Sequence, residues 1–551
     1  MAPFRTWSLG LLLYFPLVAS TPSTPTGPVL DLGFAKYLGN STAPSGESNG
    51  PVVFFGGIPF AQPPLGDLRF RAPQPLNETP SGPVNVTDAR NFALPCIQQP
   101  AAEGVGSEDC LYLNVWKPAN ATESSKLPVA FYIYGGGFVD GTTQGFPLYD
   151  WVAQNPGIVG VSVGYRLNAL GFLAGSAVGQ DGDFNNGLLD QRAALGWVQR
   201  HIRKAGEDPE RVTIIGESAG AASVVMQVVA YGGEGSPPFN RAVTQSIGYG
   251  PTYHVLSSHS EVVFSNFTAA AGCSSSSDAL ACLRGASVAS IISGVNSVGS
   301  VAAGVDGAFL PDLPSNLLRQ GRFSTVDFLG GHCTNDGRSF ANGAPEDFHT
   351  NADIVERIFH DRWIGVTNST LRQMFEFYPE VGAPGSPFET EYDLAWTIAQ
   401  DVVFGCMEQL MADRLVAKGA TNVFTFRWNA PNPVLLTETP YEGVMHTSDL
   451  YFLFDGTTSA SNAGFAFHAF NESEALLSRE AIAAWTSFVS SNNPTEYAAL
   501  WPAYQSDARN RMVFTRGNGT TTASQLEQIS AFEAARCAFW MQEDVVDQTG
   551  V

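Results

Sequence analysis

The chain has 551 residues, of which 44% are hydrophobic and 15% are charged, and its formal net charge is −23 at pH 7. This composition excludes an intrinsically disordered protein, because disordered chains have too few apolar side chains to build a core. An acidic surface repels nucleic-acid phosphates and anionic membranes, so we expect no nucleic-acid partner.

The N-terminus has the pattern of a secretory signal peptide. Arg5 precedes an apolar stretch from Trp7 to Ala19, and small residues follow. We expect residues 1–20 to be removed by cleavage after Ser20, leaving one domain over residues 21–551. The stretch is too short to span a bilayer comfortably. We therefore expect a secreted, extracellular protein without a stable membrane anchor.

Two further features agree with secretion. Eight asparagines stand in N-x-S/T sequons, which random Ser/Thr-rich sequence also produces but which favour a glycosylated surface behind a signal peptide. They are Asn40, Asn77, Asn85, Asn120, Asn266, Asn368, Asn471 and Asn518. The seven cysteines leave at least one free thiol, and close spacing suggests disulfides Cys96–Cys110 and Cys273–Cys282. Spacing does not pair the remaining cysteines and does not resemble a zinc site.

The first strand-like segments are PVAFYIY (128–134) and IVGVSVGY (158–165). Three glycines, Gly135 to Gly137, end the first of them. They are explained either by a flexible loop or by a segment whose amides approach a substrate oxygen. Apolar residues then recur at helical spacing over 189–206, which predicts a helix.

Further strands are predicted at RVTII (211–215) and VDFLGG (326–331). Strands that alternate with helices indicate an α/β fold with a mostly parallel sheet covered on both faces. In such sheets the active site lies at the carboxyl ends of the strands.

Ser218 stands where the strand RVTII meets the helical segment AASVVMQVVA, in the pattern Gly216-Glu217-Ser218-Ala219-Gly220. A sharp turn there would hold the serine hydroxyl clear of the backbone at a helix N-terminus. The same pattern also fits an ordinary glycine-flanked turn. As a nucleophile, Ser218 needs a base and an orienting acid, and the amide of Ala219 would be an oxyanion donor.

His446, in YEGVMHTSDLYFLF, is the candidate base, because it reads as a loop residue beside buried structure. Asp336, in a turn after the strand 326–331, is the candidate acid, although an Asn-Asp-Gly turn explains it equally well. Ser218, Asp336 and His446 follow the chain order of hydrolases that carry a nucleophile on such a turn.

Together these motifs resemble the type-B carboxylesterases of the α/β-hydrolase superfamily, which include cholinesterases and fungal lipases. The resemblance covers most of the chain and depends on segments in family order. They are GIPFAQPPLGDLRF (57–70), SEDCLYLNV (107–115), YGGGF (134–138), YRLNALGFL (165–173), NNGLLDQRAALGWVQRHI (185–202) and GESAG (216–220). It implies a large, mostly parallel sheet with helices on both faces, and helical and loop excursions that form an active-site gorge.

The resemblance also implies roles for individual residues. The family acid, usually a glutamate, falls on Asp336, and the family histidine falls on His446. Two oxyanion amides map to Gly136 and Gly137, and Glu217 corresponds to a carboxylate with a secondary role.

The cysteines likewise correspond to the family pattern. Cys96–Cys110 and Cys273–Cys282 match family disulfides, and Cys406–Cys537 resembles a third pair found in cholinesterase-like members. Cys333 is then the odd thiol, which we interpret as a buried packing residue.

Departures from the family bear on the substrate. Only 13 residues, none aromatic, lie between Cys96 and Cys110, whereas cholinesterases and fungal lipases have a long loop here. A quaternary ammonium needs an aromatic face, so we expect no choline site in this loop. A loop this short is also a poor lid. The sequence 203–212 departs from the family's Phe-Gly-Gly-Asp-Pro-like stretch, and we expect it to alter only the local turn.

We therefore expect an ester hydrolase that forms an acyl-enzyme on Ser218 and needs no metal or organic cofactor. Its substrates would be small esters with short to medium acyl chains or aryl groups. The alternatives are a lipase, a feruloyl- or aryl-specific esterase, and a non-catalytic cholinesterase-like binding protein. The sequence does not determine the oligomeric state.

Overall fold

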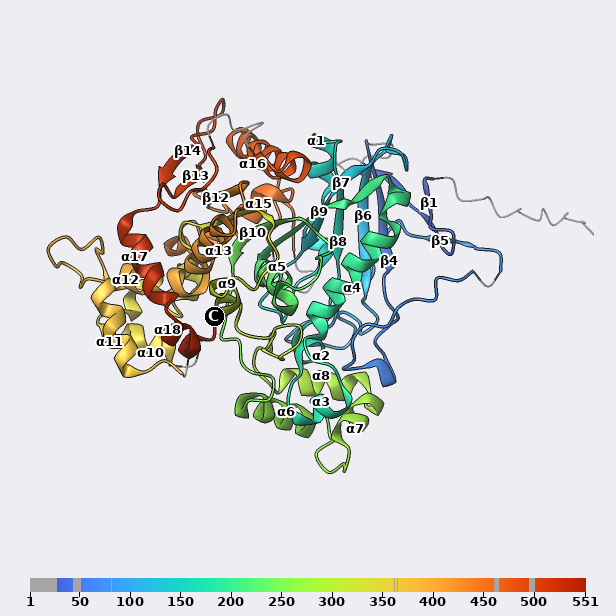
Figure 1. Ribbon diagram of the computed structural model, residues 1–551, viewed down its shortest axis with the longest axis horizontal. Coiled ribbons are helices and arrows are strands. Elements are labelled where there is room, and N and C mark those ends of the chain that lie inside the picture. Colours follow the sequence, from blue (N-terminus) through green and yellow to red (C-terminus); the bar gives the residue numbers. More distant parts are fainter. Residues whose placement is uncertain are drawn as a thin grey trace, which may run out of the picture.

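The computed structural model describes residues 27–42, 51–80, 82–360, 362–363, 365–459, 465–494 and 501–551. The expected signal peptide, residues 1–20, lies outside this part of the chain. The described chain builds one large sheet of eleven strands and a small sheet of three strands, with helices packed around them (Figure 1). The small sheet contains β1 (Val29–Asp31), β2 (Lys36–Leu38) and β5 (Val86–Asp88).

The large sheet has the strand order β14-β13-β12-β11-β10-β9-β7-β8-β6-β4-β3. Neighbouring strands from β13 to β8 are parallel, and the strands beyond them at both ends are antiparallel. The bounds are β3 (Asn40–Thr42), β4 (Val52–Pro59), β6 (Tyr112–Pro118), β7 (Leu127–Ile133), β8 (Val159–Val163), β9 (Glu207–Ser218), β10 (Arg241–Ile247), β11 (Asp327–Cys333), β12 (Val423–Trp428), β13 (Asn510–Phe514) and β14 (Gln525–Gln528).

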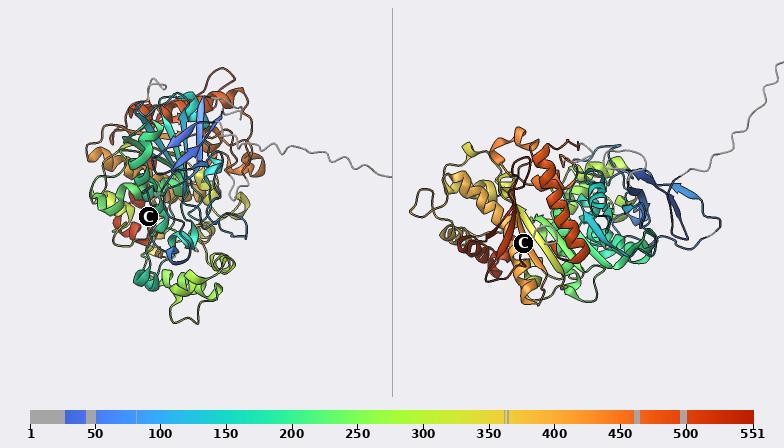
Figure 2. Two further views of the ribbon diagram at one scale, coloured as in Figure 1. Left: turned by 90° about the vertical axis from the view of Figure 1, so that its right-hand side faces the viewer. Right: turned by 90° about the horizontal axis from the view of Figure 1, so that it is seen from above.

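Helices cover both faces of this sheet, as its continuous apolar strands require. Strands β7 and β8, for example, are almost wholly buried. One group contains α1 (Tyr149–Gln154) and α16 (Glu472–Ser491), and the other contains α4 (Asn186–His201), α5 (Ala219–Val229) and α13 (Cys406–Ala417) (Figure 2). The expected mostly parallel sheet between helical layers is confirmed.

Two helical excursions extend from the sheet (Figure 1). One, at the bottom of that view, gathers α2 (Asn168–Phe172), α3 (Ser176–Asp181), α6 (Ser258–Ala270), α7 (Ala279–Gly285) and α8 (Val288–Asn296). The other, at the left, gathers α10 (Asn351–Phe359), α11 (Asn368–Phe377), α12 (Glu391–Gln400), α17 (Ala531–Trp540) and α18 (Glu543–Thr549) and has an apolar core of its own. The remaining helices are α9 (Pro314–Arg319), α14 (Leu435–Glu438) and α15 (Ser448–Leu453).

One sequence expectation needs correction here. The stretch 203–212 was expected to change only a local turn, but strand β9 already begins within it, at Glu207, which pairs with Leu127 of β7. The side chain of Glu207 is 1% exposed. The departure from the family pattern therefore puts a carboxyl group into the interior at the start of the strand that ends at Ser218.

Candidate active site

Ser218 lies at a sharp turn between β9 and α5, at the carboxyl edge of the sheet. Its backbone has φ 56° and ψ −122°, a region that residues with a side chain rarely adopt. Glycine is required on both sides. A Cβ on Gly216 would lie 2.4 Å from Gly220, and a Cβ on Gly220 would lie 2.1 Å from the carbonyl oxygen of Ile133. The packing around the turn thus explains the sequence Gly216-Glu217-Ser218-Ala219-Gly220.

Three side chains that are far apart in the sequence form a continuous hydrogen-bonded chain. The Nε2 atom of His446 lies 2.8 Å from Ser218 Oγ, and its Nδ1 atom lies 2.7 Å from Asp336 Oδ1. His446 comes from the loop before α15, and Asp336 lies three residues beyond the end of β11. An imidazole bonded in this way can take the serine proton while the carboxylate fixes its orientation.

Asp336 is fully buried, in contrast to an exposed turn former, and begins a short 3₁₀ segment, η5 (Asp336–Phe340). Its second oxygen accepts hydrogen bonds from Ser246 Oγ at 2.8 Å and from the Cys333 amide at 2.8 Å. Both carboxylate oxygens are therefore held, and Oδ1 is aimed at His446. The sequence analysis missed Ser246, which no local motif marks.

Buried carboxylates surround the imidazole. Glu217 Oε1 lies 3.3 Å from His446 Nε2, on the side of Ser218. Burial by itself lowers the pKa of His446, but the charges of Glu217 and Asp336 outweigh it and raise that pKa above its ordinary value. Burial raises the pKa of Glu217 itself to about 8. The site thus favours the imidazolium that forms when Ser218 loses its proton.

Asp449 is a further buried carboxyl group that the sequence analysis did not select. It is 1% exposed, its Oδ2 accepts a 2.5 Å hydrogen bond from Gln245 Nε2, and its Oδ1 lies 3.6 Å from Cys333 Sγ. Burial raises the pKa of Asp449 to about 6. Its position three residues after His446 was the available signal, since the first turn of α15 brings it back toward the site.

The glycine segment lies directly against the nucleophile. A Cβ on Gly135 would come within 2.9 Å of Ser218 Cβ, and Gly136 and Gly137 have φ angles of 111° and 60°. A Cβ on Gly136 would lie 2.1 Å from Asp140. The amide of Ala219, the first residue of α5, starts a helix beside Ser218. Gly135 and Ala219 are thus next to Ser218, the position at which oxyanion stabilisation would need backbone amides.

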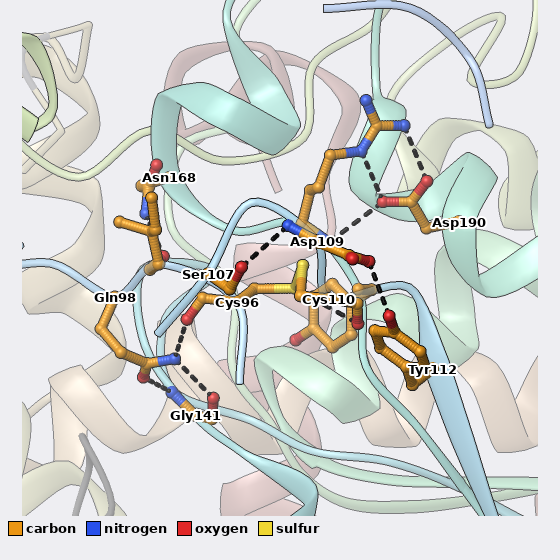
Figure 3. The surroundings of a disulfide bond; sticks show 12 residues. Cys96, Gln98, Ser107, Asp109, Cys110, Tyr112, Gly141, Asn168 and Asp190 are labelled. Carbon is orange, nitrogen blue, oxygen red and sulfur yellow. Dashed lines mark hydrogen bonds and ion pairs between the residues drawn. A yellow bond between two sulfur atoms is a disulfide. The ribbon is translucent and has the colours of Figure 1, made fainter. Parts of the chain in front are cut away.

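The segment between Cys96 and Cys110 is hydrogen-bonded to Gly141, four residues after the glycine segment Gly135–Gly137 (Figure 3). The Gln98 side-chain amide donates to the Cys96 and Gly141 carbonyls at 2.8 and 2.9 Å, and its oxygen accepts from the Gly141 amide at 2.6 Å. The next amide, of Gln99, donates to the Val139 carbonyl at 2.8 Å. The short disulfide loop is thus bonded to residues 139 and 141. A Cβ on Gly141 would lie 2.3 Å from the carbonyl oxygen of Gly135, so this residue packs against the glycine segment.

The same loop is also tied to helix α8. Asn296 accepts from the Ala101 amide at 2.7 Å and donates to its carbonyl at 2.8 Å. The side chain of Gln99 donates to the Val298 carbonyl at 2.7 Å. These bonds hold the loop at a second place, at residues 99 and 101.

Aromatic rings form a wall beside the imidazole. The ring centre of Phe404 lies 4.7 Å from that of His446, and the ring centre of Phe340 lies 5.2 Å from it. The centres of the two phenyl rings are 4.9 Å apart. Phe404 is buried, whereas Phe340 is only partly buried. Phe340 ends the segment that starts at Asp336, so one short 3₁₀ segment supplies both the carboxylate and an apolar surface.

The remaining expected sites are found as follows. The structure contains the disulfides Cys96–Cys110, Cys273–Cys282 and Cys406–Cys537. Cys333 is free and fully buried, and burial raises the pKa of its thiol well above the ordinary value, which agrees with a packing role. All eight sequon asparagines are exposed.

Among the described residues, one cluster has metal-binding atoms close together, namely Asp401, Cys406 and Cys537. Both sulfur atoms belong to a disulfide, and Asp401 is ion-paired with Arg536 at 2.5 Å, so this cluster offers no free thiolate to an ion. No helix within the described ranges is long and apolar enough to cross a membrane.

Comparison with known proteins agrees with this geometry. A family model described as the carboxylesterase family matches residues 26–540. Lipase 2 of Geotrichum candidum is 32% identical over 474 residues, which are 76% of this chain and 83% of the lipase. The cholinesterase of Mus musculus is 30% identical over 543 residues, which are 89% of this chain and 83% of that enzyme.

A solved structure extends the likeness to the whole fold. The crystal structure of Aspergillus niger EstA matches with a TM-score of 0.81 and 30% sequence identity, covering 95% of this chain and 99% of that one. Both the family model and the relatives span most of the chain. The chain therefore belongs to the carboxylesterase family and is a carboxylic-ester hydrolase with the α/β-hydrolase fold.

Proposed function

We propose that the protein is a secreted serine esterase whose nucleophile, base and acid are Ser218, His446 and Asp336. The observation that carries this proposal is the pair of hydrogen bonds at His446, 2.8 Å to Ser218 and 2.7 Å to Asp336, on a serine held in a strained backbone conformation. A neutral hydroxyl becomes a competent nucleophile only with such a base beside it.

The proposed reaction has two acyl-transfer steps. His446 Nε2 takes the proton of Ser218 Oγ as that oxygen attacks the ester carbonyl carbon. The tetrahedral intermediate then collapses, and the alcohol leaves with the proton from His446. Water, deprotonated by His446, next attacks the acyl-enzyme and releases the acid together with free Ser218.

Electrostatic stabilisation accompanies each step. The amides of Gly136, Gly137 and Ala219 would donate to the oxyanion, an interaction that strengthens as charge develops on the oxygen. Asp336 holds the Nδ1 side of the imidazole, and Glu217, 3.3 Å from Nε2, stabilises the imidazolium from the serine side. All of these charges are buried, which makes their interactions stronger than in water.

The preferred substrates in this proposal are short- to medium-chain or aryl esters. The support is the loop between Cys96 and Cys110, which is short and hydrogen-bonded on both sides, to Gly141 through Gln98 and to Asn296 through Ala101. A loop held in this way gives no movable cover that an oil surface could open.

A lipase is the second candidate, because three fungal relatives carry that name: lipase 2 of Geotrichum candidum and the secreted lipases of Botryotinia fuckeliana (strain B05.10) and Gibberella zeae. The two candidates differ in what an emulsified substrate does to the rate. A lipase with a movable lid accelerates at the oil–water surface, whereas an esterase with a fixed site saturates with the dissolved ester.

The test is hydrolysis of p-nitrophenyl acetate, butyrate and palmitate, and of emulsified tributyrin, by the wild type and by Ser218→Ala. We expect Ser218→Ala to lose about 10³-fold or more of kcat/KM on every ester. Short chains should be preferred, without acceleration above the solubility limit of tributyrin.

Ser223→Ala is the matched control. Ser223 lies on α5, five residues after Ser218, and accepts a hydrogen bond from Gln191 at 3.0 Å, so its loss should leave the esterase rate nearly unchanged. Equal activity in Ser218→Ala and the wild type would refute the catalytic assignment. A preference for palmitate with interfacial acceleration would favour the lipase, and no hydrolysis of any ester would favour the non-catalytic binding protein.

A further inference from the structure

A lone cation lies beside the aromatic wall of the site. The Arg362 guanidinium carbon is 5.0 Å from the centre of the Phe340 ring and 4.9 Å from that of Trp363. Phe340 in turn contacts the imidazole of His446 at 5.2 Å in an edge-to-face arrangement. A single aromatic ring therefore separates this guanidinium from the proposed catalytic base.

Arg362 has no acidic partner within the described part of the chain. None of the carboxylates there forms an ion pair with it, and none of the carbonyl groups accepts a hydrogen bond from its five N–H donors. Its surroundings do not remove its charge. Burial lowers the pKa of Arg362 to about 10, which leaves the guanidinium cationic at neutral pH.

Other arginines that lie on rings in the same excursion are all paired. Arg338, over Trp396, donates to the Tyr441 carbonyl at 2.8 Å. Arg357, over Phe348, binds Asp347 at 3.0 Å, and Arg536 binds Asp401 at 2.5 Å. Packing on an aromatic face is thus the common feature, and Arg362 differs because none of the carboxylates among the described residues pairs with it.

An unpaired cation that has lost much of its water is unfavourable unless something compensates it. The faces of Phe340 and Trp363 supply part of that compensation through cation–π attraction. The rings cannot accept the hydrogen bonds of the guanidinium N–H groups. Two of these groups are parallel and can both donate to one carboxylate. Arg362 is only partly buried, so the residue is not sealed off from a small anion in solution.

We infer that Arg362 binds a carboxylate on the substrate, so that the enzyme prefers esters that carry a second, ionised carboxyl group near the scissile bond. This inference rests on the proposed function, because Arg362 lies behind the ring that contacts His446. The ester carbonyl would sit at Ser218, Phe340 would contact the apolar part of the substrate, and the free carboxylate would reach Arg362. The residue thereby sets specificity and takes no part in bond making.

The test compares esters that differ in charge but hardly in shape. Monomethyl adipate and methyl adipamate carry a carboxylate or an amide on the acyl side. The acetate esters of 4-hydroxybenzoate and 4-hydroxybenzamide carry the carboxylate or the amide on the alcohol side. For each pair the ratio of kcat/KM, anionic over neutral, is measured at ~0.15 M salt, where remote charges are screened.

We expect Arg362→Gln to lower this ratio by roughly tenfold or more for at least one pair, since it removes a charged hydrogen bond, and to leave the neutral esters nearly unaffected. Arg362→Lys should have a ratio between those of Arg362→Gln and the wild type, because lysine keeps the positive charge but cannot donate two parallel hydrogen bonds. Arg357→Gln is the matched control. It also removes an arginine from an aromatic face, but an arginine already paired with Asp347, and the ratio should not change.

The outcomes separate this inference from the proposed function. If the wild type hydrolyses the neutral esters and Arg362→Gln leaves both ratios unchanged, Arg362 is a structural residue and the inference is wrong. If the wild type hydrolyses neither the neutral nor the anionic esters, the proposed function itself fails. If Arg362→Gln does not fold, the alternative experiment measures how strongly adipate and adipamide inhibit hydrolysis of a neutral ester by the wild type. Equal inhibition by the two compounds would overturn the inference.

Discussion

At the scale of single residues, the chemistry of the site depends on buried charge around His446. Two carboxylates contact its ring, Asp336 at Nδ1 and Glu217 near Nε2, and together they raise its pKa. The base must be neutral to accept the serine proton. The carboxylates that stabilise the imidazolium in the transition state therefore also raise the pH at which the free enzyme becomes active.

Glu217→Gln tests this relation. We expect the acidic limb of the kcat/KM–pH profile to move to lower pH, because an amide no longer stabilises the imidazolium and the pKa of His446 falls. At high pH, where His446 is neutral in both proteins, the variant should be slower, by about tenfold, since the transition state loses the same stabilisation. The measurement is kcat/KM for a neutral p-nitrophenyl ester between pH 5 and 10.

Glu408→Gln is the matched control for Glu217→Gln. Glu408 is also buried and binds a histidine, His332, at 2.6 Å, but that pair contacts neither Ser218 nor His446. Glu408→Gln should leave the acidic limb of the kcat/KM–pH profile at the pH of the wild type. An acidic limb at the same pH in Glu217→Gln and the wild type would show that Glu217 does not act on His446.

At the scale of elements, the loop from Cys96 to Cys110 has a different task from the one its position suggests. It lies next to the active-site residues in space, yet it is bonded beneath the glycine segment through Gln98 and to α8 through Ala101. Gln98 is 1% exposed and forms three hydrogen bonds, two of them with Gly141 (Figure 3). We propose that the loop, through Gly141, helps to orient the oxyanion amides.

Gln98→Ala should lower kcat by about tenfold with little change in KM. Gly141, which packs against the glycine segment, loses two bonds. The proposed oxyanion amides then become less well oriented, and oxyanion donors act mainly in the transition state. The neighbouring variant Gln99→Ala is the control, because that side chain reaches the Val298 carbonyl and its own amide still binds Val139. Equal kcat in the two variants would argue against the bracing role.

At the scale of the whole molecule, acidity extends from the surface into the core. Glu207 begins β9 with its side chain 1% exposed, and neither carboxyl oxygen has a hydrogen-bond partner among the described residues. The side chain of Lys117 bonds the Ala121 carbonyl instead of Glu207. Burial raises the pKa of Glu207 well above its ordinary value. Burial thus favours the neutral form of this group at the start of the strand that carries Ser218.

This burial makes stability depend on pH. Between the ordinary glutamate pKa and the raised one, the folded state binds more protons at Glu207 than the unfolded state does, so the free energy of unfolding falls as pH rises. Glu207→Gln removes the ionisable group. Relative to the wild type, its Tm should be higher at pH 8, and this advantage should disappear near pH 4. Thermal unfolding followed by circular dichroism at the two pH values measures the difference.

The exposed Glu123, which pairs with Lys204 at the surface, supplies the control. Glu123→Gln should change Tm equally at both pH values, by little or nothing. A Glu207→Gln variant whose Tm difference from the wild type is the same at pH 4 and pH 8 would contradict the burial argument.

The sequence alone determined the elements that local patterns encode. Apolar β-branched runs predicted β7, β8, β9 and β11, and helical spacing predicted α4, whose end at His201 is followed by one 3₁₀ turn, η3 (Ile202–Ala205). The family motifs then predicted a catalytic role for Ser218, Asp336 and His446, three side chains that are hydrogen-bonded to one another in the structure. These features were readable because they depend on short-range periodicity or on motifs contiguous in the chain.

Tertiary structure alone decided which side chains meet. Ser246, Asp449 and Gln98 come from three separate segments and were not selected, since no local pattern marks a residue whose role is to bind another far along the chain. Glu207 was read as part of a turn, and only the packing of β9 against β7 shows that it is buried. Arg362 likewise resembles any surface arginine until the fold places it on Phe340 without an anion. The physical reason is the same throughout: burial and partnership are set by contacts between distant segments.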